Sequence, residues 1–324
     1  MRAVICSKFG EPEELKVLDV PDILPGEGQV RIAIEACGVN FPDTLIIKNA
    51  YQYKPKLPFS PGGEVTGKID ALGTGVTNYN VGDNVMAMTL YGGFSEQIVV
   101  DAFSLLKRPL NMEAIIAAGF TMTYGTSMHA LKQRANLQPG ESLLVLGAGG
   151  GVGLAAVEIG KAMGAIVIAA ASSDLKLKAA KRAGADHLIN YEKENFREQI
   201  RASVGTKGVD VVFDPVGGNY FEPALRSTSW NGRVLVVGFA SGKIPQVPAN
   251  LPLLKGCAVV GVFWGAFRQK QTDLDNQNFK QLFSWFEDGK INPYISDCYS
   301  LDETSLALRK LISREAIGKI VVTT

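Results

Sequence analysis

The chain has 324 residues, 46% of them hydrophobic and 20% charged, which is enough for two ordinary globular domains. Its 33 basic and 32 acidic side chains leave a formal charge of +1, so no overall field attracts nucleic acid or an anionic membrane. We expect neither a nucleic-acid nor a membrane partner.

The N-terminal segment MRAVICSKFGEPEELKVLDV alternates apolar and polar residues and lacks the pattern of a secretory signal. Every apolar run is shorter than the roughly 20 residues that span a bilayer. The four cysteines form no C-x-x-C pair, and the two histidines, His129 and His187, have no metal-ligand spacing. These features predict a cytoplasmic protein with reduced core thiols and structural histidines.

Short β-type runs separated by Gly and Pro characterise residues 1–122 and predict a β-rich first domain. The runs are RAVICS, LKVLDV, QVRIAIEACGV, GEVTGKIDALG, DNVMAM and FSEQIVV.

From Thr123 onward strands alternate with helices, a rhythm typical of βαβ units in a doubly wound parallel sheet. The predicted strands are 143–148, 166–172, 187–191, 209–216, 233–239 and 257–264, and the predicted helices are 152–163, 174–183, 194–204 and 219–229. We therefore assign residues 123–265 to a cofactor domain. Helices expected at 273–288 and 302–313 and the final run KIVVTT break the rhythm, so residues 266–324 are expected to return to the first domain.

A glycine-rich turn, GAGGGVG (147–153), lies directly between the first strand and the first helix of this domain. Glycine lets the backbone approach a pyrophosphate, and the N–H groups at the helix start bind its charge. Ala148 stands where G-x-G-x-x-G has its first glycine, and a simple flexible turn is the alternative. The flanking strand and helix favour dinucleotide binding.

An NAD site commonly has Asp or Glu at the end of the second strand, where it binds the ribose 2′-OH. Here that stretch contains Ser172 and Lys176, which suit a 2′-phosphate. Asp174 leaves NAD as an alternative cofactor, because a small shift of register would bring its carboxylate to the ribose. The other interpretation of Asp174 is an acidic residue in the first turn of a helix, where the helix dipole stabilises it. We favour NADPH.

Ten segments carry a family pattern: GVNFPD (38–43) followed by Tyr51, LPFSPGGEVTG (57–67), VGDNV (81–85), YGTSMHAL (124–131), GAGGGVG (147–153), RAGADHLINY (182–191), DVVFDPVGG (210–218), GRVLVVGFASG (232–242), GVFWG (261–265) and IGKIVV (317–322). Over nearly its whole length the chain resembles the medium-chain dehydrogenase/reductase family, and most closely its zinc-free quinone oxidoreductases. The resemblance implies an α/β protein with a groES-like catalytic domain, a Rossmann cofactor domain and an active site in the cleft between them.

The resemblance also implies the absence of zinc. Where the zinc alcohol dehydrogenases of the family have their catalytic ligands, this chain has Asn40, Gly63 and Ala118, and the cysteine-rich lobe for structural zinc is missing. Without a Lewis acid, reduction of an already activated acceptor is the expected chemistry.

Matching to the quinone oxidoreductase pattern implies four groups of cofactor contacts. Thr123, Gly150, Gly151 and Val152 are expected at the pyrophosphate, Ser172, Lys176 and Tyr191 around the 2′-phosphate, Val216, Gly217, Gly238, Phe239 and Ala240 along the strand ends, and Phe263 and Trp264 beside the nicotinamide.

The expected reaction is hydride transfer from NADPH to a quinone or to the β-carbon of an α,β-unsaturated carbonyl compound. Asn40 and Tyr51 are the candidate hydrogen-bond donors to the developing oxygen anion, and Asp43 is expected to brace their loop. The structural alternatives are an Asn40 that only satisfies backbone groups and a Tyr51 that is an exposed loop aromatic.

Other readings stay open at this point. A 2-enoyl-thioester reductase would share the fold and cofactor, and a low-turnover NADPH-binding protein could serve as a sensor, a structural protein or a single-stranded RNA binder. The strand expected at CAVVGVFW (257–264) ends the predicted sheet and predicts a homodimer through edge-to-edge pairing.

Overall fold

A computed structural model describes residues 1–193 and 195–324. The chain forms two compact units: Met1–Met122 together with Tyr294–Thr324, and Thr123–Pro293. No helix in the described part of the chain is long and apolar enough to cross a bilayer.

The first unit is β-rich, as the sequence predicts. Its larger sheet has seven strands in the order β14-β15-β3-β4-β5-β7, with β6 also paired to β3, and a separate antiparallel pair is formed by β1 and β2. The strands are β1 (Arg2–Ile5), β2 (Lys16–Asp19), β3 (Gln29–Val39), β4 (Glu64–Leu72), β5 (Asn84–Met88), β6 (Gln97–Asp101), β7 (Leu106–Lys107), β14 (Ile295–Ser300) and β15 (Lys319–Thr323). Along β3 buried side chains alternate with partly exposed ones, so one face of the sheet packs on the core.

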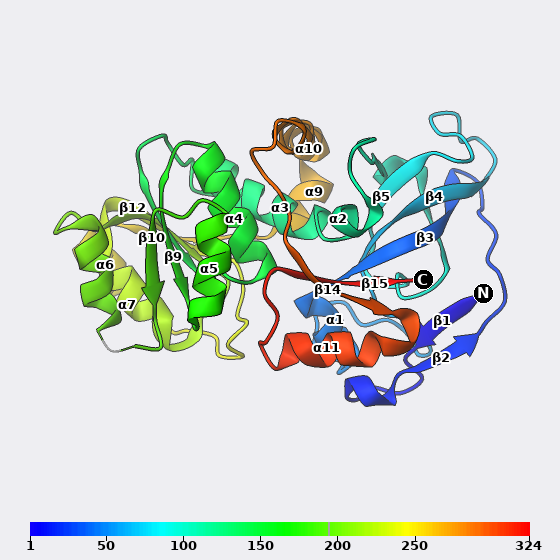
Figure 1. Ribbon diagram of the computed structural model, residues 1–324, viewed down its shortest axis with the longest axis horizontal. Coiled ribbons are helices and arrows are strands. Elements are labelled where there is room, and N and C mark those ends of the chain that lie inside the picture. The colour runs from blue at the N-terminus through cyan, green and yellow to red at the C-terminus, as the bar shows by residue number, and fades with distance from the viewer. Residues whose placement is uncertain (194) are drawn as a thin grey trace. The chain divides into compact units, whose positions relative to one another are not determined.

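Short helices complete this unit. They are α1 (Phe41–Ile46), α2 (Ala114–Ala118) and α11 (Thr304–Ile312), with single 3₁₀ turns at η1 (Pro12–Glu14), η2 (Ala102–Ser104) and η5 (Leu301–Glu303). The red α11 lies beside the blue α1 in Figure 1, and the two helices are in contact. Segments from both ends of the chain therefore meet in one core, which includes Ile46, Ile47, Leu308 and Ile320.

The second unit contains a six-stranded parallel sheet in the order β10-β9-β8-β11-β12-β13. Its strands are β8 (Ser142–Leu146), β9 (Ile166–Ala171), β10 (His187–Asn190), β11 (Val209–Asp214), β12 (Thr228–Val236) and β13 (Ala258–Gly261). The order corresponds to 3-2-1-4-5-6 of a doubly wound dinucleotide-binding sheet. The predicted fold class is thereby confirmed.

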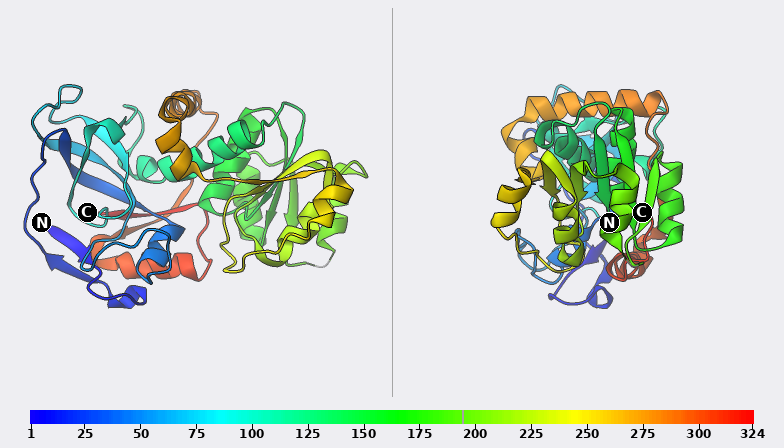
Figure 2. Two further views of the ribbon diagram at one scale, coloured as in Figure 1. Left: turned by 180° about the vertical axis from the view of Figure 1, so that it is seen from behind. Right: turned by 90° about the vertical axis from the view of Figure 1, so that its left-hand side faces the viewer.

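Helices cover both faces of this sheet. The elements are α3 (Thr121–Met128), the π-helix η3 (His129–Arg134), α4 (Gly151–Ala162), α5 (Asp174–Arg182), α6 (Phe196–Val204), η4 (Gly218–Tyr220), α7 (Phe221–Arg226), α8 (Asn250–Lys255), α9 (Trp264–Lys270) and α10 (Thr272–Glu287). In Figures 1 and 2, α4 and α5 lie on one face of the sheet and α6 and α7 on the other.

Several expected boundaries differ, and one cannot be compared. The strand expected at 257–264 ends at Gly261, and α9 begins at Trp264. Residue 194, the expected first residue of a helix, lies outside the described residues. The expected helix 219–229 is shorter, because β12 already begins at Thr228 and pairs there with Val209. The chain returns to the first unit at Tyr294 rather than at residue 266, since α10 packs in the second unit, where Phe279 meets the Trp264 ring at 6.3 Å.

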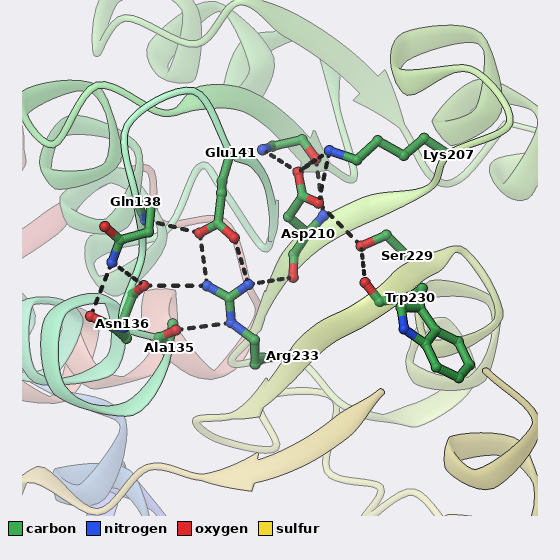
Figure 3. Close-up of polar contacts among 10 residues, drawn as sticks. Ala135, Asn136, Gln138, Glu141, Lys207, Asp210, Ser229, Trp230 and Arg233 are labelled. Atoms are coloured by element: carbon green, nitrogen blue, oxygen red, sulfur yellow. Dashed lines mark hydrogen bonds and ion pairs between the residues drawn. The ribbon is translucent and has the colours of Figure 1, made fainter. Parts of the chain in front are cut away.

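A polar network joins the amino-terminal parts of three parallel strands (Figure 3). Arg233 of β12 donates to both carboxylate oxygens of Glu141, at 2.7 and 2.8 Å, and to the Ala135 carbonyl at 2.9 Å. Asp210, near the start of β11, accepts from the amide and hydroxyl of Ser142, at 2.9 and 2.8 Å. With one end of the sheet fixed in this way, the carboxyl ends of the strands remain for a ligand, as is usual in open α/β sheets.

Candidate functional site

The turn between β8 and α4 has the geometry that its glycines predict. The Gly150 amide donates to the Gly147 carbonyl at 3.0 Å, and Gly147 has a φ of +61°. A Cβ at Gly153 would lie 2.2 Å from the Gly147 oxygen, so turn and helix are too close for a side chain there. The first turn of α4, with Gly151 and Val152, presents N–H groups that have no acceptor within the helix. This turn is shaped for an anionic ligand.

Lys176 lies beside the same turn. Its Nζ donates to the Ser172 hydroxyl at 3.4 Å, which is a long hydrogen bond. Its aliphatic stem covers Gly149, where a Cβ would lie 2.4 Å from the lysine Cβ. The structure therefore brings together two of the three residues expected at a 2′-phosphate, and Lys176 lies against the glycine turn.

Asp174 is the first residue of α5 and has partners of its own. The Asn190 amide donates to its carboxylate at 3.1 Å, and Lys193 lies 3.7 Å from the same oxygen. An acidic residue in the first turn also stabilises the helix through its interaction with the helix dipole. The Tyr191 ring packs against Tyr220, with 4.2 Å between ring centroids and a tilt of 36° between the ring planes.

The loops after β11 and β12 are joined by backbone hydrogen bonds. The Ala240 amide donates to the Pro215 carbonyl at 3.0 Å, and a Cβ at Gly217 would lie 3.0 Å from the Phe239 ring. Asp214 is buried and accepts from the amides of Val216 and Gly217 at 2.7 and 2.8 Å. Burial raises the pKa of this carboxyl group.

Sequence analysis did not assign a role to Asp214, which shapes the turn that was expected to contact the cofactor. The remaining residue of this predicted set, Gly238, donates its amide to the Asp214 carbonyl at 3.3 Å, so the set converges on one pair of strand ends.

The residues expected near the nicotinamide fall into two kinds. Phe263 is 68% exposed, whereas Trp264 is buried and its indole N–H donates to Asp275 at 2.8 Å. A Cβ at Gly125 would lie 2.6 Å from the Trp264 ring, so this ring fills the core beside α3. The ring and the N–H donor of Trp264 both have partners inside the unit, so the expected place of Trp264 beside the nicotinamide stays a prediction. Thr123, on α3, is buried.

Asn40 precedes α1 in the first unit, and its side chain is fully engaged. The amide nitrogen Nδ2 donates to the Gly38 carbonyl at 3.2 Å and to Glu64 at 2.8 Å, and the amide oxygen accepts from Lys319 at 2.7 Å. An amide has two N–H donors, and both are used. These contacts favour the structural alternative for Asn40, in which the side chain organises its loop, over the predicted role as a donor to the acceptor's oxygen.

Asp43 braces this loop, as expected. Its carboxylate accepts from the Asn40 backbone amide at 2.7 Å at the start of α1. The group is 3% exposed, and burial raises its pKa to about 7.

Tyr51 is half-buried, and within the described chain its hydroxyl has no hydrogen-bond partner. Burial, aided by the charge of Asp43, raises the pKa of the phenol above its ordinary value of 10. The group therefore stays protonated at neutral pH and is able to donate. Of the two predicted donors, Tyr51 is the one with an unused O–H.

Comparison with known proteins identifies the family. The model of the alcohol dehydrogenase GroES-like domain matches residues 26–110, and that of the zinc-binding dehydrogenases matches residues 151–287. The chain is 37% identical to the quinone oxidoreductase-like protein 2 homolog of Nematostella vectensis, covering 100% of this chain and 89% of that one. The chain belongs to the quinone oxidoreductase family of medium-chain dehydrogenases/reductases.

Two further similar proteins are named quinone oxidoreductase. Human quinone oxidoreductase is 33% identical, covering 99% of this chain and 97% of its own. The crystal structure of Escherichia coli quinone oxidoreductase complexed with NADPH superimposes with a TM-score of 0.92 at 27% identity, and the match covers 100% of both chains.

One of the matching family models is that of the zinc-binding dehydrogenases. Among the described residues, no group of three His, Cys, Asp or Glu side chains could hold a metal ion, and Asn40, Gly63 and Ala118, which the resemblance puts at the positions of the catalytic ligands, are residue types that zinc sites do not use. His129 stacks on Phe267 at 4.0 Å, and burial lowers its pKa to about 4.

The described cysteines are free. Cys6 and Cys37 are buried, as expected for core thiols, whereas Cys298 is exposed, contrary to that expectation.

Proposed function

We propose that this protein is an NADPH-dependent reductase that transfers a hydride to a quinone or an α,β-unsaturated carbonyl compound without catalytic zinc. The observation that carries the proposal is the cluster of Ser172, Lys176 and Gly149 beside the anion-binding turn at α4. It supplies a cation and a hydroxyl where a 2′-phosphate needs them. The NADPH complex of the Escherichia coli relative supports the same cofactor.

NADPH supplies a hydride when it is bound. The residues of this chain bind and orient it: the first turn of α4 takes the pyrophosphate, and Lys176 and Ser172 take the 2′-phosphate. The loop fixed by Asp214 presents Val216 and Gly217 along the cofactor. Such a preformed set of contacts lowers the barrier mainly by orientation.

Tyr51 is the group we propose to act on the acceptor. Its protonated hydroxyl donates a hydrogen bond to the oxygen that gains negative charge as the hydride arrives. An acceptor that already contains a conjugated carbonyl needs no Lewis acid, which agrees with Asn40, Gly63 and Ala118 at the ligand positions.

The test is an assay of NADPH oxidation against a panel of quinones, enones and enoyl thioesters, run with and without a strong chelator, with elemental analysis of the same preparation. We expect turnover with quinones or enones, unchanged by the chelator. Turnover with enoyl thioesters alone would identify a thioester reductase, and no turnover with any acceptor would reduce the protein to a cofactor binder. Loss of activity on removal of one bound metal per chain would contradict the zinc-free mechanism.

A further inference from the structure

Lys319 is a buried lysine whose ammonium group is fully hydrogen-bonded. It is 5% exposed and lies at the first position of β15. Its Nζ donates to the Val39 carbonyl at 2.9 Å, to the Asn40 amide oxygen at 2.7 Å and to Glu64 at 3.1 Å. An ammonium has three N–H groups, so each has one acceptor.

Glu64, the carboxylate partner, is 0% exposed and joins three segments. One oxygen accepts from Lys319 and from the Asn40 amide, and the other accepts from the Met122 backbone amide at 2.8 Å, near the start of α3. A buried charge pair of this kind is tolerated because the remaining lone pairs are also satisfied.

The pair fixes the orientation of the Asn40 side chain. Lys319 offers only donors and therefore requires the amide oxygen, while Glu64 offers only acceptors and requires the amide nitrogen. If the amide flipped, its N–H groups would face the Lys319 ammonium and its oxygen would face the Glu64 carboxylate, so donor would meet donor and acceptor would meet acceptor. Asn40 in turn begins α1, whose first turn is closed by Asp43 and whose end leads to Tyr51.

The backbone next to Glu64 is closely packed. A Cβ at Gly38 would lie 2.0 Å from the Ala118 carbonyl oxygen and 2.7 Å from the Glu64 carboxylate. Gly38 therefore has no space for a side chain beside Glu64.

We infer that Lys319 and Glu64 are positioning residues for the reduction: they orient Asn40 and thereby the α1 loop that ends at Tyr51. The expected effect on the reduction rate rests on the proposed function. The expected effect on the orientation of Asn40 and the α1 loop rests on geometry alone. It makes the C-terminal strand, which arrives 279 residues after Asn40, a required part of the acceptor side of the site.

The first test removes both charges together, with Lys319→Met/Glu64→Gln, so that no unpaired charge remains buried. The control is Lys310→Met, which breaks the 2.6 Å ion pair with Asp297 elsewhere in the same unit. Single-turnover NADPH oxidation should fall about ten- to a hundred-fold in the double variant and stay within about twofold of the parent in the control. The NADPH dissociation constant should change little in either.

A double-mutant cycle separates positioning from general damage. In an Asn40→Ala background the same charge removal should cost less than about threefold in rate, because the side chain that the pair orients is already gone. A full additional loss in that background would overturn the inference, as would a parental rate in the double variant.

A structural readout does not depend on activity. Hydrogen exchange of the segment 38–51 should accelerate in Lys319→Met/Glu64→Gln and not in Lys310→Met. If the double variant does not fold, Lys319→Arg replaces it, because this substitution keeps the charge but lengthens the side chain. Hydrogen exchange of the segment 38–51 should accelerate in Lys319→Arg as well. An inactive parent would overturn the proposed function alone, whereas unchanged exchange in both variants would overturn this inference.

Discussion

Lys176 is the residue whose contacts bear most directly on the choice of cofactor. Lys176→Met keeps the stem that covers Gly149 and removes the charge. NADPH binding should weaken by about 1.5–3 kcal/mol, the range for a hydrogen bond to a charged group, while NADH binding stays nearly unchanged. The measurement is the pair of dissociation constants at fixed salt, with Lys178→Met on the same helix as the control. Equal losses for both cofactors would contradict the assignment.

Among the described residues, Tyr51 has a free hydroxyl donor for the acceptor, whereas the donors of Asn40 are already used, and the kinetics of variants should separate the two roles. Tyr51→Phe should lower the single-turnover rate about 10²- to 10³-fold, the effect of losing one preorganised donor, and leave NADPH binding intact. Asn40→Ala should also slow the reaction, but through displacement of the loop, so segment 38–51 should exchange faster only in that variant. Tyr53→Phe is the matched control. A parental rate in Tyr51→Phe would leave the residue without a catalytic role.

Glu158 gives the protein a pH dependence of stability. It accepts a 2.5 Å hydrogen bond from Tyr124, and burial raises its pKa from 4.5 to about 7. Between these values the folded protein retains a proton that the unfolded chain has lost, so the free energy of unfolding falls as the pH rises from 4.5 to 7. Glu158→Gln should remove up to about 3 kcal/mol of that fall.

The measurement for Glu158 is urea unfolding of parent and Glu158→Gln at intervals between pH 5 and 8. Asp43 and His129 also titrate, but they are common to both proteins, so the difference isolates Glu158. Parallel curves would show that the carboxyl group is not protonated in the folded state.

At the residue level, sequence could propose the residues of the candidate site but not the contacts among them. The turn at 147–153 and the pair Ser172 and Lys176 follow from local pattern, because their function depends on neighbours within one βαβ unit. Lys319 and Glu64 are 255 residues apart, and no spacing rule links them. From its sequence position, Trp264 could contact a ligand or fill the core. The hydrogen bond from its indole N–H to Asp275, which favours the core, is visible only in the structure.

At the scale of elements, two glycines in and after the turn between β8 and α4 differ in the space available for a side chain. A Cβ at Gly153 would lie 2.2 Å from the Gly147 oxygen, while one at Gly150 would lie 3.6 Å from it. Gly153→Ala should therefore reduce stability by about 1–3 kcal/mol through overpacking. Gly150→Ala should leave stability nearly unchanged and weaken NADPH binding, because the added methyl group meets the ligand instead. Urea unfolding and cofactor titration check both; equal stability of the two variants would be inconsistent with the packing.

Regular elements were predictable where a period of two or 3.6 residues runs long enough. All six strands of the parallel sheet were expected, since each lies in a short strand-type run between turns. The short helix α1 and the strand β14 were missed. α1 has six residues and is stabilised by the contact between Asn40 and Asp43, and β14 is recognisable only through its pairing with β15.

For the whole molecule, the exposed edge of the parallel sheet raises the question of assembly. β13 is the last strand of that sheet, as predicted, and in the described chain no further strand pairs with its outer side. Large apolar side chains flank it in sequence: Leu253 and Leu254 are 76% and 71% exposed, and Phe263 is 68% exposed. An uncovered edge with apolar neighbours is a surface that proteins normally pair or protect.

We therefore predict a homodimer in which two copies of β13 pair across a two-fold axis and continue the sheet from one subunit into the other. Sedimentation at micromolar concentration should give twice the 34.7 kDa chain mass. Val260→Lys places a charge on this strand and should shift the protein toward monomer, because the charge would be buried against its own copy. Leu188→Lys, on the opposite edge strand β10, is the matched control and should leave the mass unchanged. A monomer at every concentration, or equal effects of the two substitutions, would exclude pairing through β13.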